Sequence, residues 1–123
     1  MEEKIKNFTD LESWKLAHQL TLEIYKQTQK FPKEETFGVT SQIRRAASSI
    51  SANIAEGFAR FHFNDKKRFY YQARGSVAEV QNFIFLVKDL GLISEATTYI
   101  LFDQTNQVAR LINGLIRSIE QQK

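Results

Sequence analysis

Apolar residues recur along this chain mostly at intervals of three and four positions, the spacing of one face of an α-helix. There are four such segments, and no strong strand pattern is present. The pattern predicts helices at about residues 9–29, 40–60, 64–90 and 94–120. Because short links favour antiparallel neighbours, we expect an all-α, up-down-up-down four-helix bundle that forms a single domain over residues 1–123.

An apolar stripe on each predicted helix indicates the face that packs into the core. The first stripe contains Leu11, Trp14, His18, Thr21, Tyr25 and Thr28. The second contains Ile43, Ala46, Ala47, Ile50, Ile54, Gly57, Phe58 and Phe61. The third contains Phe69, Ala73, Val77, Val80, Ile84, Val87 and Leu90. The fourth contains Leu101, Val108, Leu111, Ile112, Leu115 and Ile119.

Residues that favour helix ends mark the boundaries. Thr9 or Asp10 is expected to cap the first helix and Asn64 the third, because short polar side chains accept hydrogen bonds from free backbone N–H groups. Ser94 opens the fourth helix. Gly91 ends the third, because glycine adopts the left-handed conformation without strain.

The predicted helix at residues 41–60 has an unusual polar side. A solvated helix face usually consists of Lys, Glu and Gln, but here short side chains are interrupted by a few ionic groups. At about 100° per residue, one sector away from the apolar stripe holds Arg45, Ser49, Ala52, Asn53, Glu56 and Arg60. Small residues let another backbone come close, whereas contact with water does not require them.

The third helix has a matching track, formed by Arg68, Gln72, Gly75, Glu79 and Asn82. Glycine in mid-helix costs roughly 1 kcal/mol relative to alanine, so Gly57 and Gly75 each need a packing reason. We therefore expect a polar contact zone in which arginines form partly buried, bidentate pairs with carboxylates between packed helices. Its predicted members are Arg45, Asn53, Glu56, Gly57, Gly75 and Glu79, with Arg60 and Arg68 as further pairing partners.

A second apolar track lies outside the predicted core stripes. Tyr71 and Phe85 lie far from the core stripe of the third helix, and Leu16 and Leu20 lie away from that of the first. Apolar surface of this kind favours self-association. The alternative is a wide core stripe in an ordinary monomer.

Composition narrows the class of protein. The 123 residues include no cysteine, which excludes disulfides, thiolate chemistry and cysteine-ligated metal. The apolar run at residues 83–87 is far shorter than the roughly 20 residues of a membrane span, and the N-terminus lacks the apolar run of a signal peptide. We expect a cytoplasmic protein without membrane contact.

Positive charge is concentrated in the middle of the chain. Between residues 44 and 74 seven basic residues face two acidic ones, a local charge of +5 within a net charge of +3. Such a region suits an anionic partner, although an unevenly charged, solvated surface is an equal alternative. The candidate nucleic-acid-binding residues are Arg44, Arg60, Lys66, Lys67, Arg68 and Arg74, with Tyr70 and Tyr71 as possible stacking partners.

No catalytic constellation is recognisable. Of the two histidines, His18 is expected on the core side of the first helix and His62 in a link, and neither has metal-ligand spacing. Asn53 and Glu56 suit an interhelix contact better than catalysis. No glycine-rich phosphate loop is present. We expect no enzymatic activity, no metal and no cofactor.

The segments SQIRRAASSISANIAEGFAR and KKRFYYQARGSVAE carry a family resemblance. With FTDLESWKLAHQL near the start and the Phe31-Pro32 turn, they resemble the 23S rRNA intervening-sequence proteins over nearly the whole chain. One departure is Ser51, where the family pattern often has proline that would kink the helix. The family is encoded within large-subunit rRNA genes of some bacteria, and elsewhere as free-standing genes.

The resemblance implies an antiparallel four-helix bundle and a homopentameric ring, as in the similar accessory variability proteins of diversity-generating retroelements, which bind nucleic acid and a reverse transcriptase. The family has no established activity. Two hypotheses follow: an oligomeric accessory protein that binds RNA or DNA, and an oligomeric scaffold that acts through protein partners. A monomeric bundle with a small ligand in its core is a third, weaker reading.

Overall fold

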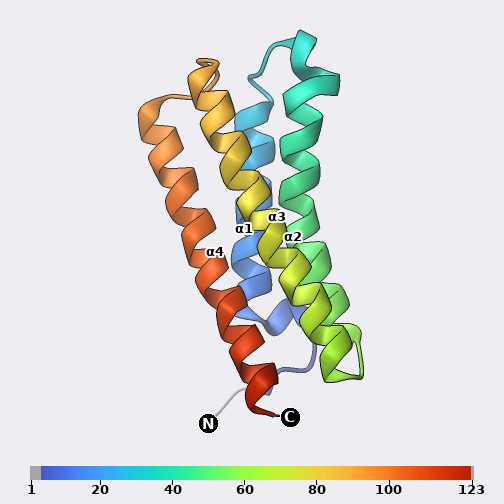
Figure 1. Ribbon diagram of the computed structural model, residues 1–123. Coiled ribbons are helices and arrows are strands. Elements are labelled where there is room, and N and C mark those ends of the chain that lie inside the picture. Colours follow the sequence, from blue (N-terminus) through green and yellow to red (C-terminus); the bar gives the residue numbers. More distant parts are fainter. Residues whose placement is uncertain (1–3, 123) are drawn as a thin grey trace.

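The computed structural model describes residues 4–122, and within this range it contains four α-helices and no strand. They are α1 (Glu12–Thr28), α2 (Ser41–Ala59), α3 (Phe63–Asp89) and α4 (Glu95–Gln121), shown in Figure 1. The all-α class predicted from the apolar spacing is therefore confirmed, and each helix boundary lies within three residues of its predicted position. Within the described range, no helix is both long and apolar enough to cross a bilayer.

The helices form one bundle in which α1 and α3 each pack against both α2 and α4. The α1–α2 and α3–α4 connections lie at one end, and the α2–α3 connection lies at the other end with the two termini (Figure 1). Two side-chain contacts, between Arg45 and Glu79 and between Ser49 and Ser76, show that α2 and α3 run in opposite directions.

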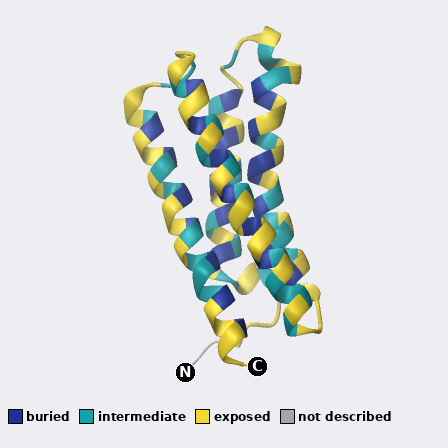
Figure 2. Cartoon of the chain, in the orientation of Figure 1, coloured by how far each residue is buried: buried dark blue, intermediate teal, exposed yellow. Residues whose placement is uncertain are grey.

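Buried residues line the inner face of every helix (Figure 2). Fully burying a Leu, Ile or Val side chain contributes about 1.5–3 kcal/mol, so this interior is the main source of stability. The predicted stripe of α2 is confirmed from Ile43 to Gly57. The largest fully buried side chains are Leu20, Ile24, Ile43, Ile50, Ile54, Ile84, Leu101, Ile112, Val80, Val87, Val108 and Thr105.

The predicted core stripe of α1 was wrong. The buried residues of this helix are Ser13, Ala17, Leu20, Ile24 and Thr28. His18 is exposed and stacks on Trp14, with ring centroids 4.7 Å apart. Small residues at two of the buried positions bring α1 close to its neighbours, which leaves the larger rings at the edge of the core. Leu20, expected to point outward, is buried, so it offers no surface for self-association.

Smaller corrections apply to the other stripes. Tyr70 rather than Phe69 is buried on α3, and Leu90 is exposed where that helix ends. On α4 the buried position is Ile116, while Leu111 and Leu115 are half-buried. Phe61 is outside the core altogether, because α2 ends two residues before it.

Two of the expected caps were wrong. Asn7 and Asp10 form a reciprocal capping box around a 3-10 turn at Phe8–Asp10, while α1 itself begins without a side-chain cap. Asn64 lies inside α3, which follows His62 without a side-chain cap. In both places the chain enters the helix at a different residue from the nearest polar one.

The two signals around the α3–α4 connection are confirmed. Gly91 has a φ of 76°, and the Leu92 N–H donates to the Val87 carbonyl at 2.9 Å, which closes a Schellman motif. The Ser94 hydroxyl oxygen accepts from the Thr97 N–H at 3.0 Å and caps α4.

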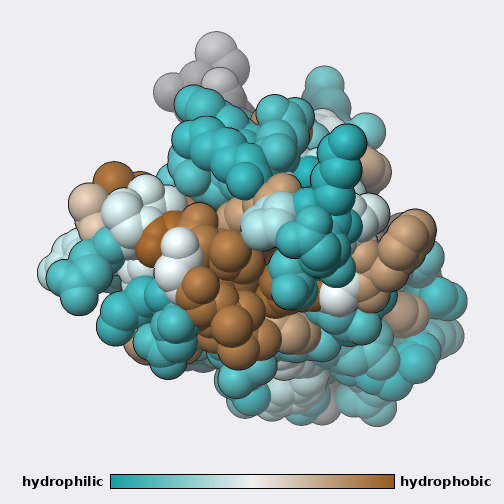
Figure 3. Space-filling model, turned by 90° about the horizontal axis from the view of Figure 1, so that it is seen from above, coloured by the Kyte–Doolittle hydropathy of each residue, from teal (hydrophilic) through white to brown (hydrophobic). Residues whose placement is uncertain are grey.

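The α1–α2 connection contains a 3-10 turn at Lys33–Glu35 and a wider turn at Thr36–Thr40. Phe37 in this turn is 95% exposed, and Leu90 is exposed in the α3–α4 connection. Figure 3 views this end of the bundle and shows an apolar area on it.

Candidate nucleic-acid interface

Two arginines at the α2–α3 end of the bundle pack on one aromatic ring. The guanidinium carbon of Arg60, just after α2, lies 4.7 Å from the centroid of Phe69. The guanidinium carbon of Arg68, on α3, lies 4.6 Å from the same centroid. The negative faces of an aromatic ring attract cations, so Phe69 holds two positive charges near each other. We call Arg60, Arg68 and Phe69 the arginine cluster.

Only part of the cluster's charge is neutralised within the described residues. Arg60 donates to the Glu56 carboxylate at 3.1 Å, one turn earlier on α2. Arg68 has no carboxylate within 4.0 Å in residues 4–122. The predicted Arg60–Glu56 pair therefore exists, but within α2 rather than between helices. The cluster keeps unused guanidinium N–H donors that face water.

Lys66, another predicted phosphate ligand, is engaged inside the fold. Its Nζ donates to the carbonyls of Phe58 at 2.8 Å and Gly57 at 3.3 Å, in the last turn of α2. Burial lowers the pKa of this ammonium group through desolvation. A cation at a helix C-terminus satisfies free carbonyls, so Lys66 fixes the α2–α3 connection instead of projecting from it. The neighbouring Lys67 makes no hydrogen bond or ion pair within the described residues.

Gly57 has the packing reason that its mid-helix position required. A Cβ atom at this position would lie 2.5 Å from Cε1 of Tyr70, well inside van der Waals contact. Tyr70 is 2% exposed, so it fills this space and is not the stacking partner that the sequence suggested. Desolvation by burial raises the pKa of Tyr70 to about 12.

A stacking residue that the sequence reading missed lies next to the cluster. Phe61, assigned from its spacing to the core, is 87% exposed in the connection. Its ring packs against that of His62 at 89°, with centroids 5.2 Å apart. The signal that could have revealed it is the end of α2, since the apolar period continues past the last helical residue.

The predicted pair between Arg45 and Glu79 joins α2 to α3, but it is not bidentate. One guanidinium nitrogen of Arg45 donates to the Glu79 carboxylate at 2.9 Å and to Gln42 Oε1 at 3.0 Å. The two side chains of the ion pair are 60% and 38% exposed. Exposed pairs contribute about 1 kcal/mol at most, so this contact adds little to the stability of one chain.

Part of the small-residue side of α2 packs within the chain. The Ser49 hydroxyl donates to Ser76 at 2.7 Å, and the Asn53 amide donates to the Ser49 carbonyl at 2.8 Å. Ala52 and Gly75 remain exposed, and a Cβ on Gly75 would meet no atom within 4 Å. The packing reason for Gly75 therefore does not lie within the described residues.

Arg44 and Arg74 lie away from the arginine cluster. Arg44 Nε donates to Thr28 at 2.8 Å near the start of α2, about 24 Å along the helix axis from Arg60. Arg74 donates to Asn113 at 3.0 Å and lies over Tyr71, on the side of α3 that faces α4. The six predicted cations are thus spread over three places.

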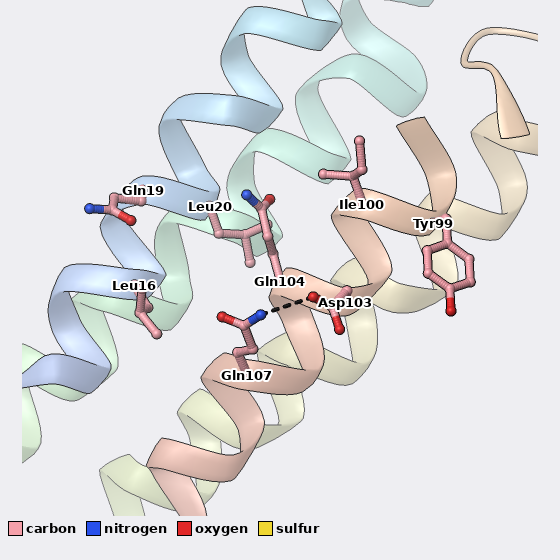
Figure 4. A pocket seen from close by; sticks show the side chains of 8 residues that line it. All are labelled: Leu16, Gln19, Leu20, Tyr99, Ile100, Asp103, Gln104 and Gln107. Carbon is pink, nitrogen blue, oxygen red and sulfur yellow. Dashed lines mark hydrogen bonds between the residues drawn. The ribbon is translucent and has the colours of Figure 1, made fainter. Parts of the chain in front are cut away.

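A separate groove of about 340 Å³ lies between α1 and α4 (Figure 4). Gln107 donates to Asp103 at 2.9 Å in it, and the buried Oε1 of Gln104 has no partner within the described residues. Residues 4–122 contain no group of three His, Asp or Glu that could hold a metal ion. The groove is lined by Leu16, Gln19, Leu20, Tyr99, Ile100, Asp103, Gln104 and Gln107.

Comparison with known proteins agrees with the fold. The family model described as 23S rRNA-intervening sequence protein matches residues 9–114. A crystal structure of a protein of unknown function from the S23 ribosomal protein family of Bacteroides thetaiotaomicron superimposes with a TM-score of 0.79. It is 18% identical and covers 85% of this chain and 95% of its own. No curated protein matches the sequence. Because the family model spans most of the chain, this protein belongs to the 23S rRNA-intervening sequence protein family.

Proposed function

We propose that this up-down-up-down bundle assembles with copies of itself and binds the phosphate backbone of RNA or DNA, without catalysing a reaction. The observation that carries the proposal is the arginine cluster. Phe69 holds two guanidinium groups near each other, and Arg68 has no carboxylate partner within the described residues. Phosphate oxygens would complete the unused N–H donors through charge-assisted hydrogen bonds.

Assembly strengthens this site because it repeats it. The surface of α2 and α3 exposes Ala52 and Gly75 beside the Arg45–Glu79 pair, and Gly75 has open space around it. A second copy packed on this surface gives the mid-helix glycine its reason and partly buries the ion pair. A pentameric ring, which the family resemblance implies, would present five arginine clusters.

Fluorescence anisotropy with a labelled, structured RNA tests the binding site. The double variant Arg60→Gln/Arg68→Gln should bind at least tenfold more weakly, because charged hydrogen bonds contribute about 1.5–3 kcal/mol each. The matched control is Lys26→Gln/Arg110→Gln, which removes two exposed charges elsewhere and should bind like the wild type. Equal loss in both double variants would show a diffuse charge effect and contradict a site at the cluster.

The second candidate function is a scaffold that acts through protein partners. The exposed small-residue surface favours it, since close contact with another protein needs small side chains at those positions. The same experiment separates the two functions. An assembled protein that binds no nucleic acid at low salt would support the scaffold and overturn the nucleic-acid proposal.

A further inference from the structure

The connection between α2 and α3 presents one aromatic ring to solvent. Phe61 lies between Arg60 and His62, both of which have extended backbone, at φ −76°, ψ 147° and φ −86°, ψ 140°. Burial of a phenyl ring is favourable, so a side chain that is 87% exposed forgoes a contact that the core usually supplies. This exposure is what a stacking platform requires.

The backbone that carries Phe61 is held in place on both sides. The Arg60 N–H donates to the Gly57 carbonyl at 3.3 Å, and the Lys66 N–H donates to the His62 carbonyl at 3.0 Å. The Lys66 ammonium ties the start of α3 to the last turn of α2. A ring on a fixed connection loses little conformational entropy on binding, which favours its use as a contact.

We propose that Phe61 stacks on an unpaired base while Arg60 and Arg68 hold neighbouring phosphates, so that the preferred ligand is single-stranded nucleic acid. This inference rests on the proposed function and adds the strandedness of the ligand. The faces of bases inside a duplex are already covered by their neighbours, and exposing one costs unstacking energy. Aromatic stacking accepts any base, so we expect little sequence preference.

The chain offers a matched control for the ring. Phe37 is 95% exposed in the α1–α2 connection, at the opposite end of α2 from the arginine cluster. Truncating either ring to alanine removes exposed surface only, so both variants should fold like the wild type. Circular dichroism and thermal melting verify this before binding is measured.

Anisotropy is measured with a labelled oligothymidine of twelve nucleotides and with a duplex of the same length. Phe61→Ala should weaken binding of the single strand by between fivefold and a hundredfold, as expected of about one lost base stack. Its affinity for the duplex should stay within about twofold of the wild type. Phe37→Ala should change neither, and Phe61→Trp should restore binding of the single strand.

The outcomes separate the two proposals. If Phe61→Ala binds both ligands like the wild type, or weakens both equally, the stacking role is overturned. The arginine cluster then stands or falls on Arg60→Gln/Arg68→Gln. If the wild type binds neither ligand at low salt, both proposals are overturned.

Discussion

Replacing Gly57 with alanine is the sharpest test of the packing at the α2–α3 connection. The added Cβ would lie 2.5 Å and 2.8 Å from two ring carbons of Tyr70, and 3.2 Å from the Lys66 carbonyl oxygen. The optimal separation of carbon atoms is about 3.5–4.0 Å, so the ring must move by about 1 Å. Tyr70 is buried and has no free space to enter.

The expected magnitude combines two opposing terms. Overpacking in a filled core costs about 1–3 kcal/mol, while alanine gains about 1 kcal/mol over glycine in helix propensity. We therefore expect Gly57→Ala to lower the free energy of unfolding by about 1–2 kcal/mol. For a chain of this size, that lowers Tm by about 4–8 °C.

Thermal melting followed by circular dichroism measures this change. Gly114→Ala is the control, because its Cβ would meet only the end of the Arg117 side chain at 3.9 Å, and it should raise Tm. In a Tyr70→Leu background the cost of Gly57→Ala should largely disappear, since the clashing ring carbons are gone. A Gly57→Ala variant as stable as the wild type would refute the reasoning.

Three further predictions concern single residues. Tyr70 has a pKa of about 12 in the folded protein against an ordinary 10.0, so its contribution to stability is complete below pH 10 and is lost as the pH rises toward 12. Tyr70→Phe should accordingly remove the step near pH 12 from the absorbance titration of tyrosinate, and an unchanged titration would contradict this. Lys66→Met should lower the free energy of unfolding by about 1 kcal/mol, because it removes the cap of α2, and Lys67→Met should change it by less than about 0.5 kcal/mol in denaturant titrations; equal effects would count against the cap. Gly75→Leu should reduce the assembled mass measured by light scattering while leaving a folded chain of 14.3 kDa, because its side chain enters open space within one chain, and Ala96→Leu on α4 should leave the mass unchanged. An unchanged mass for Gly75→Leu would exclude α2–α3 as the assembly surface.

The helical spacing was sufficient to predict the fold, because most buried positions on α2, α3 and α4 follow it without interruption. It failed on α1, where Ser13 and Ala17 are buried and Trp14 is not. Hydrophobicity ranks the larger rings as core, whereas close approach between helices favours the small residues. Spacing alone does not report how near a neighbouring helix lies.

The candidate site was predicted in part. The tracks on the second and third helices correctly paired Arg45 with Glu79, because both follow the helical period. The roles of Lys66 and Phe61 were not predictable, since they depend on the residue at which α2 ends and on how α3 leaves it. The common packing of Arg60 and Arg68 on Phe69 likewise exists only once the two helices lie side by side.

The salt dependence of binding tests the central claim, that the arginine cluster contacts phosphates, most directly. The affinity for oligothymidine is measured over a series of salt concentrations, for the wild type and for Arg68→Gln. For the wild type, the logarithm of the binding constant should fall linearly with the logarithm of the salt concentration. Loss of one phosphate contact should make the slope for Arg68→Gln shallower by about 0.7 for each cluster engaged. Identical slopes for the two proteins, or no dependence on salt, would contradict the account.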